Sequence, residues 1–267
     1  VLDCFDHPRV SGDCNVETAV DIQMEKALEV RTGMATAVVA FGRAGQSVAR
    51  YLAELGARVL VSDSRKLFEL TGEERAILQS CGAEFEGGGQ TLEFLGDAEM
   101  IVASPGVPLD NPVLLLAVEN NIPVVGELAL AAGRFRCPVI AVTGTNGKTT
   151  VTELIGELLK AAGRTPFIGG NIGTPVCEYL RHPSAYDAAV LELSSFQLEN
   201  CGAFAPDIGV MLNISPDHLD RHGTIEKYAA AKMRLFRDKK KTTVAVINGE
   251  DRLIGRYLHF SDVESFS

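Results

Sequence analysis

The chain has 267 residues, of which 46% are hydrophobic and 22% charged, and its formal net charge is −10. Domains of about 100–200 residues suggest two of them here, and no apolar run approaches the roughly 20 residues that a membrane span requires. The negative charge disfavours broad affinity for nucleic acids or membrane surfaces, so an anionic substrate would need local cations and helix ends. Six cysteines without a C-x-x-C pair are typical of reduced thiols in a cytoplasmic protein.

Residues 1–33 differ in character from the rest of the chain. They carry scattered acids, two early cysteines and only a weak helical pattern over 16–30. We expect an irregular leader, which is a non-native extension if Met24 or Met34 is the natural start.

A regular alternation of strand and helix patterns begins at Met34. The predicted strands cover 36–41, 58–62, 83–86, 100–103 and 122–125, and the predicted helices cover 46–55, a segment opening at Asn111-Pro112, and 127–133. Alternation of this kind is typical of a doubly wound α/β domain. The sequence therefore predicts a Rossmann-like domain over 34–136.

Candidate binding loops follow three of these strands. Gly42-Arg43-Ala44-Gly45 is glycine-rich, but Ala40 occupies the place of the first glycine in G-x-G-x-x-G. Asp63 lies where an acid meets the ribose in dinucleotide folds, so NAD binding stays open at this point. Ser104-Pro105-Gly106 follows the fourth strand, where either a ligand loop or a plain turn fits.

The alternation restarts at Pro138, after a predicted boundary near 134–137. We expect a strand from Val139, helices over 152–162, 224–236 and 251–257, and strands over 188–191, 208–212 and 243–247. This pattern, together with the loop after its first strand, predicts a second doubly wound domain over 137–267, similar to the P-loop NTPases.

The segment from Val139 to Thr150 is the most informative one. A buried strand leads into Gly144-Thr145-Asn146-Gly147-Lys148-Thr149-Thr150 and then into a helix. Backbone N–H groups in such a turn face phosphate, a lysine adds a cation, and a threonine hydroxyl binds Mg²⁺. Val142 replaces the first glycine of the common motif. The loop predicts a nucleoside triphosphate site, and a phosphate-loop switch protein remains an alternative.

Three further segments suggest a reaction. Gly169 to Pro175 is a glycine-dense loop in which Asn171 can donate and accept hydrogen bonds. Glu192 ends a strand, where a carboxylate beside a phosphate loop suits Mg²⁺. Asn213 to His222 gathers acids, imidazoles and a guanidinium, and His218 could complete a second metal site.

These segments resemble the Mur ligase family. The resemblance rests on four motifs in order, covers roughly 34–257, and is strongest to the members that add D-glutamate. The motifs are Thr143-Gly-Thr-Asn-Gly-Lys-Thr-Thr, Gly170-Asn-Ile-Gly-Thr-Pro, Leu191-Glu-Leu-Ser-Ser-Phe-Gln-Leu-Glu and Asn213-Ile-Ser-Pro-Asp-His-Leu-Asp-Arg-His.

The resemblance implies a reaction in peptidoglycan synthesis, and thus a part in cell wall biogenesis, cell shape and cell division. ATP phosphorylates the carboxylate of UDP-N-acetylmuramoyl-L-alanine, and the amine of D-glutamate attacks the acyl phosphate. Two Mg²⁺ ions are implied, one on Thr149 and Glu192 and one on His218, with Lys148 on the β/γ-phosphates. Asn171 would contact the muramoyl substrate. The loops nearest the uracil and phosphates of the UDP end would be Gly42–Gly45, Asp63-Ser64-Arg65 and Ser104-Pro105-Gly106.

Lys232 matches the lysine that this family carbamylates. CO₂ adds only to a neutral amine, and with a reference pKa near 10.4 only about one lysine in 10³ is neutral at pH 7. Burial and a nearby metal shift that balance. The resemblance therefore implies a carbamate at Lys232 that bridges Mg²⁺, whereas the bare sequence also fits a solvated lysine on an alanine-rich helix.

The resemblance also bears on extent and specificity. Such ligases have a third, C-terminal domain, yet only about ten residues follow Tyr257. We expect a chain of this extent to be an inactive fragment with an incomplete central domain, which binds the UDP sugar weakly. Other Mur ligases and folylpolyglutamate synthetase share the phosphate loop, so another amino-acid ligase is the alternative function.

Overall fold

The computed structural model describes residues 29–237, 242, 244–257 and 265–266. Most of the predicted leader and residue 243 of the last predicted strand therefore lie outside the described residues. Within this part of the chain, no helix is long and apolar enough to cross a membrane.

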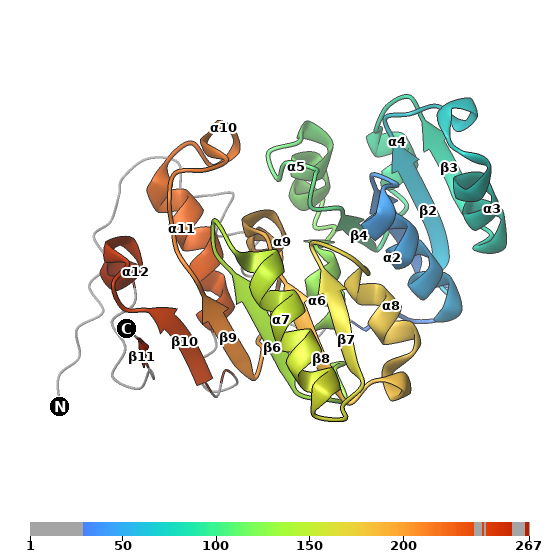
Figure 1. Ribbon diagram of the computed structural model, residues 1–267. Helices are drawn as coiled ribbons and strands as arrows, with labels where there is room; N and C mark the ends of the chain where they lie inside the picture. Colours follow the sequence, from blue (N-terminus) through green and yellow to red (C-terminus); the bar gives the residue numbers. More distant parts are fainter. Residues whose placement is uncertain (1–28, 238–241, 243, 258–264, 267) are drawn as a thin grey trace, which may run out of the picture.

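The first domain is built on a five-stranded parallel sheet (Figure 1). The strand order is β3-β2-β1-β4-β5, with pairs such as Val38↔Val61 and Val38↔Val102 fixing the register. The strands are β1 (Ala35–Val39), β2 (Arg58–Asp63), β3 (Glu84–Gly87), β4 (Met100–Ala103) and β5 (Val124–Val125). Every residue of the two central strands β1 and β4 is buried, as expected where helices cover both faces of a sheet.

Helices connect these strands. They are α2 (Arg43–Glu54), η1 (Leu67–Glu69), α3 (Gly72–Ser80), α4 (Leu92–Leu95), α5 (Pro112–Glu119) and α6 (Glu127–Ala131). The sequence pattern did not predict α3, although Thr71 and Glu74 form a capping box at its start. Too few apolar residues mark its buried face for periodicity to reveal it.

The second domain is built on a six-stranded sheet in the order β11-β10-β9-β6-β8-β7, and every pair is parallel. Its strands are β6 (Val139–Thr143), β7 (Pro166–Gly170), β8 (Ala188–Glu192), β9 (Ile208–Met211), β10 (Val244–Asn248) and β11 (Ser265–Phe266). Its helices are α7 (Lys148–Ala161), α8 (Val176–Arg181), η2 (Pro183–Ala185), α9 (Ser195–Glu199), α10 (Leu219–His222), α11 (Ile225–Met233), η3 (Arg234–Phe236) and α12 (Arg252–Tyr257).

Three details of the second domain correct the sequence prediction. The helix predicted over 152–162 begins at Lys148, because the threonines of the phosphate loop form its first turn. The glycine-dense segment is partly strand, since β7 takes up Pro166–Gly170. Proline and glycine are poor strand formers, but β7 lies at the sheet edge, where a missing N–H is tolerated. The sequence pattern also missed helices α8 and α9, which are too short to show a helical period.

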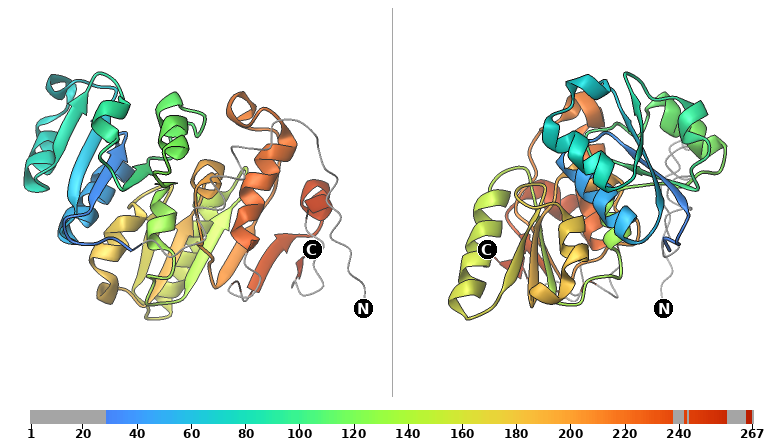
Figure 2. Two further views of the ribbon diagram at one scale, coloured as in Figure 1. Left: turned by 180° about the vertical axis from the view of Figure 1, so that it is seen from behind. Right: turned by 90° about the vertical axis from the view of Figure 1, so that its right-hand side faces the viewer.

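The two domains share a packed boundary. Helix α6 contributes Leu128 and Ala131 to the second core but Ala129 and Leu130 to the first. Helix α8 packs against α2 (Figure 2). Arg181 bonds Glu54 there at 2.6 Å. The predicted α/β class with two doubly wound domains is confirmed, while the residue limits 34–136 and 137–267 stay predictions.

Candidate functional site

The phosphate loop joins β6 to α7 through two glycines with positive φ, Gly144 at 149° and Gly147 at 83°. Gly147 precedes α7 and supplies no side chain to cap it. The N–H groups of the first turn and the positive end of a 14-residue helix are therefore available to an anion.

Asn213, which follows β9, holds this loop in place. Its Oδ1 accepts hydrogen bonds from the N–H groups of Thr145 at 3.1 Å and Asn146 at 2.8 Å, and its Nδ2 donates to the Asn146 carbonyl at 3.0 Å. Lys148 Nζ donates to the Thr145 carbonyl at 2.9 Å. The loop is thus preformed, and the sequence pattern gave Asn213 no such role.

Glu192 lies at the end of β8, next to β6 in the sheet. It is only 2% exposed. Its Oε2 accepts a hydrogen bond from Thr149 Oγ1 at 2.8 Å, and its Oε1 accepts one from Asn171 Nδ2 at 2.9 Å. Both partners are neutral, so hydrogen bonds rather than an ion pair hold this carboxylate among the described residues. A buried carboxylate beside a threonine hydroxyl is a donor set that fits Mg²⁺.

Lys232, on α11, is 1% exposed and reaches the same loop. Its Nζ donates to the Gly144 carbonyl at 2.9 Å and lies 4.6 Å from the centre of the Tyr228 ring. Burial, helped by the charge of Lys148, lowers the pKa of Lys232 to about 7. About half of the amine is therefore neutral at pH 7. The hydrogen bond to Gly144 places Lys232 beside the phosphate loop that carries Lys148 and Thr149.

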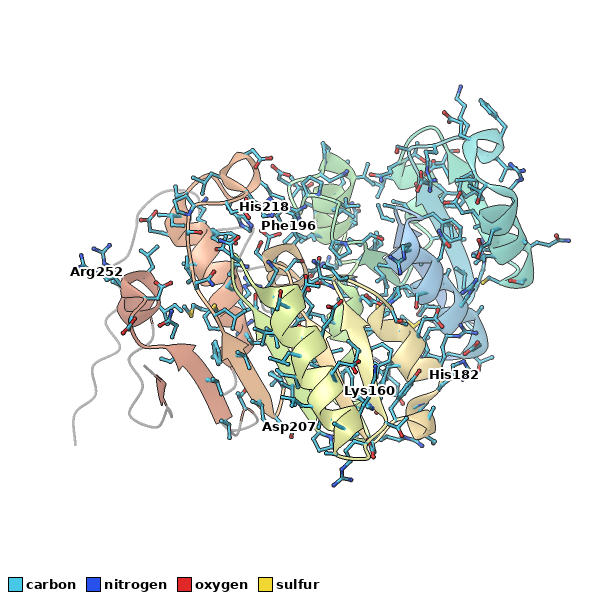
Figure 3. The ribbon with its side chains drawn as sticks, in the orientation of Figure 1. Lys160, His182, Phe196, Asp207, His218 and Arg252 are labelled. Carbon is cyan, nitrogen blue, oxygen red and sulfur yellow. The ribbon has the colours of Figure 1, made fainter. Side chains whose placement is uncertain are left out.

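His218 lies in the loop after β9, in which Asn213 and Ser215 bond Thr145 of the phosphate loop. Its ring is half-exposed, lies 4.9 Å from the Phe196 ring, and its Nε2 is 3.6 Å from Asp217 Oδ2 (Figure 3). Its backbone is left-handed, with φ of 50°. Within the described ranges, no three His, Cys, Asp or Glu side chains converge as metal ligands.

A buried network behind His218 was not predicted. His222 Nε2 lies 3.0 Å from Ser195 Oγ, and its Nδ1 lies 3.0 Å from Glu199 Oε1. Burial and the nearby charge of Arg221 lower the pKa of His222 to about 4. The neutral ring therefore donates a hydrogen bond from Nδ1 to Glu199 and accepts one at Nε2 from the Ser195 hydroxyl. Ser195 is only 1% exposed, which excludes it as an accessible nucleophile.

Asp63, at the end of β2, is tied to its own domain. Its Oδ2 accepts from the Phe41 N–H at 2.6 Å, and its Oδ1 accepts from Arg65 N at 2.8 Å and Nε at 3.0 Å. Burial raises the pKa of Asp63, but these hydrogen bonds outweigh it and leave the pKa lowered. Arg65 Nη1 also donates to Glu74 Oε1 at 3.0 Å. Ser64 is exposed.

The predicted loops of the two domains meet across the boundary. Arg43, in the glycine turn, donates to the Gly173 carbonyl of the loop that carries Asn171. Pro105 receives a hydrogen bond from Arg221 of the second domain at 2.9 Å. The structure thus places the glycine turn and the Ser104 loop along the edge of the second domain, with Asp63 and Arg65 bonded within the first.

Comparison with known proteins identifies the family. Residues 34–126 match the MurD-like N-terminal domain of Mur ligases, and residues 142–265 match the Mur ligase middle domain. The chain belongs to the Mur ligase family. The resemblance inferred from the four motifs is confirmed.

Curated relatives agree with this assignment. The UDP-N-acetylmuramoylalanine--D-glutamate ligase of Desulfotalea psychrophila is 46% identical over 81% of this chain and 47% of its own length. The protein of that name from Koribacter versatilis is 44% identical over 84% of this chain and 49% of its own. The chain spans about half the length of the curated relatives it matches.

Solved structures agree on the fold. The UDP-N-acetylmuramate-alanine ligase MurC of Thermotoga maritima matches 88% of this chain and 53% of its own, with a TM-score of 0.50 and 24% identity. A murein peptide ligase from Psychrobacter arcticus matches 84% of this chain and 51% of its own, with a TM-score of 0.52 and 19% identity. At these identities the likeness shows the fold alone.

Proposed function

We propose that this chain carries the UDP-substrate and ATP domains of an ADP-forming ligase. Its reaction would add D-glutamate to UDP-N-acetylmuramoyl-L-alanine, in cytoplasmic synthesis of peptidoglycan precursors. The observation that carries this proposal is Glu192, a buried carboxylate held by Thr149 and Asn171 beside the phosphate loop. The choice of D-glutamate is supported by what the relatives are named.

The residues of the second domain fit ATP and Mg²⁺. When bound, ATP supplies the phosphoryl group that activates the substrate carboxylate, and Mg²⁺ offsets the charge of the approaching anions. The uncapped start of α7 would hold the phosphates, together with Lys148. Thr149 and Glu192 would hold one Mg²⁺, and His218 a second.

Lys232 fits the carbamate that the family resemblance implies. Its lowered pKa gives the neutral amine that CO₂ requires, at a position within 2.9 Å of the Gly144 carbonyl. The carbamate would change a buried cation into an anion. That change supplies the negative ligand which a second Mg²⁺ would need beside His218.

The first domain would hold the uridine end of the substrate. The match of residues 34–126 to a Mur ligase N-terminal domain favours this interpretation of Asp63 over NAD binding. Asp63, Ser64 and Arg65 would contact the nucleoside, and Ser104, Pro105 and Gly106 the diphosphate. Asn171 would contact the muramoyl group across the boundary.

Nucleotide binding tests the proposal on the chain itself. Lys148→Ala should weaken Mg²⁺-ATP binding at least about tenfold in calorimetry, because one charge-assisted hydrogen bond is worth ~1.5–3 kcal/mol. Lys160→Ala is the matched control, since Lys160 lies at the other end of α7 and pairs with Glu157 (Figure 3). Equal losses in both variants would contradict the phosphate site.

Substrate dependence tests the reaction. Phosphate release on adding UDP-N-acetylmuramoyl-L-alanine should require D-glutamate in a form of the protein that turns over. Release that is equally supported by other amino acids would favour another ligase of the family. The chain itself should bind the UDP sugar.

A further inference from the structure

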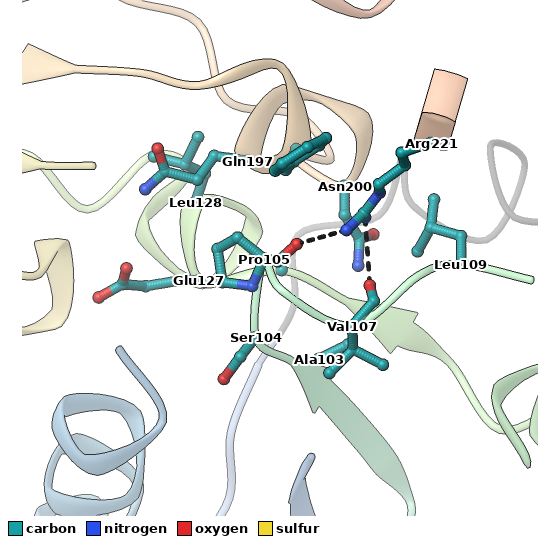
Figure 4. A pocket seen from close by; sticks show the side chains of 12 residues that line it. Ala103, Ser104, Pro105, Val107, Leu109, Glu127, Leu128, Gln197, Asn200 and Arg221 are labelled. Carbon is teal, nitrogen blue, oxygen red and sulfur yellow. Dashed lines mark hydrogen bonds between the residues drawn. The ribbon is translucent and has the colours of Figure 1, made fainter. Parts of the chain in front are cut away.

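Arg221 connects the two domains through its guanidinium group (Figure 4). Nη1 donates to the Pro105 carbonyl at 2.9 Å, and Nη2 lies 3.2 Å from the Val107 carbonyl and 3.0 Å from Glu199 Oε2. Its carbon Cζ lies 4.2 Å from the centre of the Phe196 ring. Arginine suits this position because it combines a donor fork with a flat face that stacks on aromatic rings.

The carbonyls that Arg221 contacts belong to the loop after β4. Ser104, at the start of that loop, donates to the Ala40 carbonyl at 2.8 Å. Ala40 precedes the glycine turn and has a left-handed backbone, with φ of 69°. A side chain at Gly45 would lie 2.2 Å from the same Ala40 carbonyl, so the turn packs directly on it. A group that holds Pro105 in place therefore also helps to hold the glycine turn against the loop after β4.

On the other side, Arg221 is joined to the candidate catalytic edge. Glu199 ends α9, the helix that follows Glu192 in the chain, and Phe196 of that helix touches both Arg221 and the His218 ring. The Glu199 carboxylate is oriented by His222, at 3.0 Å. Arg221 thus lies in one continuous set of contacts from the first-domain loops to His218.

Arg221 faces a narrow space on one side and a wider one on the other. The pocket that it lines with Ser104, Pro105 and Phe196 has a volume of about 10 Å³, which leaves room for about one water molecule. The hollow that it lines with Glu199 and His222 is larger, about 430 Å³. On the narrow side, where Arg221 bonds the Pro105 and Val107 carbonyls, its contacts hold two backbone segments at a set distance.

We propose that Arg221 is a positioning residue, which holds the loop at Ser104–Val107 at the distance from His218 that the bound UDP sugar must span. This inference rests on the proposed function, because the loop is assigned there to the diphosphate. Its effect should be on the sugar and not on the nucleotide, since Arg221 contacts the phosphate loop only through other residues. An ordinary interdomain ion pair would instead affect stability alone.

Binding measurements on the chain separate these two roles. Arg221→Lys keeps the charge but cannot span both carbonyls, and Arg221→Met removes the charge. Both should weaken binding of UDP-N-acetylmuramoyl-L-alanine at least about tenfold in calorimetry, because a loop released from Arg221 must be ordered when the sugar binds. The affinity for Mg²⁺-ATP should change less than about twofold.

Arg181→Met is the matched control, because Arg181 also joins the domains but through the Glu54 side chain, away from the loops. It should leave UDP-sugar affinity unchanged while lowering the melting temperature. Unchanged UDP-sugar affinity in folded Arg221→Lys would overturn the inference, as would equal losses of sugar and nucleotide affinity. Failure of the unmodified chain to bind the UDP sugar would instead count against the proposed function.

Discussion

Each domain has a buried acidic residue at the end of a strand, but the partners of the two carboxylates differ in charge. Asp63 and Glu192 both end parallel strands and are 4% and 2% exposed. Asp63 is neutralised by the guanidinium of Arg65, whereas Glu192 is held by a hydroxyl and an amide. The first domain completes its charge balance within itself, and the second leaves a buried charge that a ligand could balance.

This difference indicates that the end of β8, at Glu192, is the strand end that suits a bound cation. Burying a charge without a counter-ion costs free energy, so a fold keeps such a group where a ligand offsets that cost. Lys232 repeats the pattern in the opposite sign, with a carbonyl as its hydrogen-bond acceptor. Asp63, by contrast, has its charge balanced by Arg65, so the loop that it would present to the nucleoside keeps its shape without a ligand.

The largest expected effect comes from removing Lys232. If it becomes a metal-binding carbamate, Lys232→Ala should lower turnover about 10²–10³-fold, since electrostatic groups of this kind contribute ~10²–10³ each. Short-chain carboxylic acids should restore part of the activity by replacing the carbamate. Lys227→Ala is the control, because Lys227 lies on the exposed side of the same helix. Full activity of Lys232→Ala would refute the role.

The sequence predicted some features of the second domain and missed others. The phosphate loop was predictable because its signal is local, a buried strand followed by two glycines, a lysine and a helix. The burial of Lys232 was not, since Tyr228-Ala-Ala-Ala-Lys232 has the pattern of an exposed helix. Its burial arises from packing against Gly144, which is 88 residues away in the chain.

Long-range partners explain the rest of what sequence reasoning missed. Asn213 clamps a loop 67–68 residues earlier, and Arg221 contacts carbonyls 114–116 residues earlier. Neither has a local motif, although a polar residue directly after a buried strand, as at Asn213, is a usable signal. The parallel order of β8, β6 and β9 brings the phosphate loop, Glu192 and Asn213 together.

The second largest effect is expected from a substitution at Asp63, the acid that is paired with Arg65. Asp63→Asn should destabilise the chain by about 1–3 kcal/mol, because it replaces a charged acceptor of several buried hydrogen bonds. The lowered pKa of Asp63 sets the sign of its pH dependence. Its contribution is present above the unfolded pKa near 4 and is lost as pH falls through the folded value. Urea unfolding should show a larger difference between Asp63→Asn and the unmodified chain at pH 7 than at pH 3.

His222 offers a test of the comparison away from the strand ends. Its pKa is lowered to about 4, so between pH 4 and 6.5 the unfolded chain binds the extra proton. Stability should therefore fall as pH drops through this window, by about 1–3 kcal/mol. His222→Gln should flatten that part of the profile measured by denaturant unfolding. Parallel profiles would show that His222 is not held neutral in the folded chain.

The smallest effect is the most direct test, because its sign is opposite to that at Asp63. Glu192→Gln removes a buried charge that has no counter-ion among its hydrogen-bond partners, and the amide can still bond Thr149 and Asn171. The ligand-free variant should gain about 1 kcal/mol of stability, because no cation lies within ion-pair distance of this buried charge among the described residues and Lys232 acts on it only through a longer-range attraction. Differential scanning calorimetry should show the gain without Mg²⁺-ATP, and a smaller rise in melting temperature than the unmodified chain on adding it, since fewer Mg²⁺ ligands remain. A loss of stability equal to that of Asp63→Asn would mean that both strand ends are internally balanced, and the distinction between the two strand ends would fail.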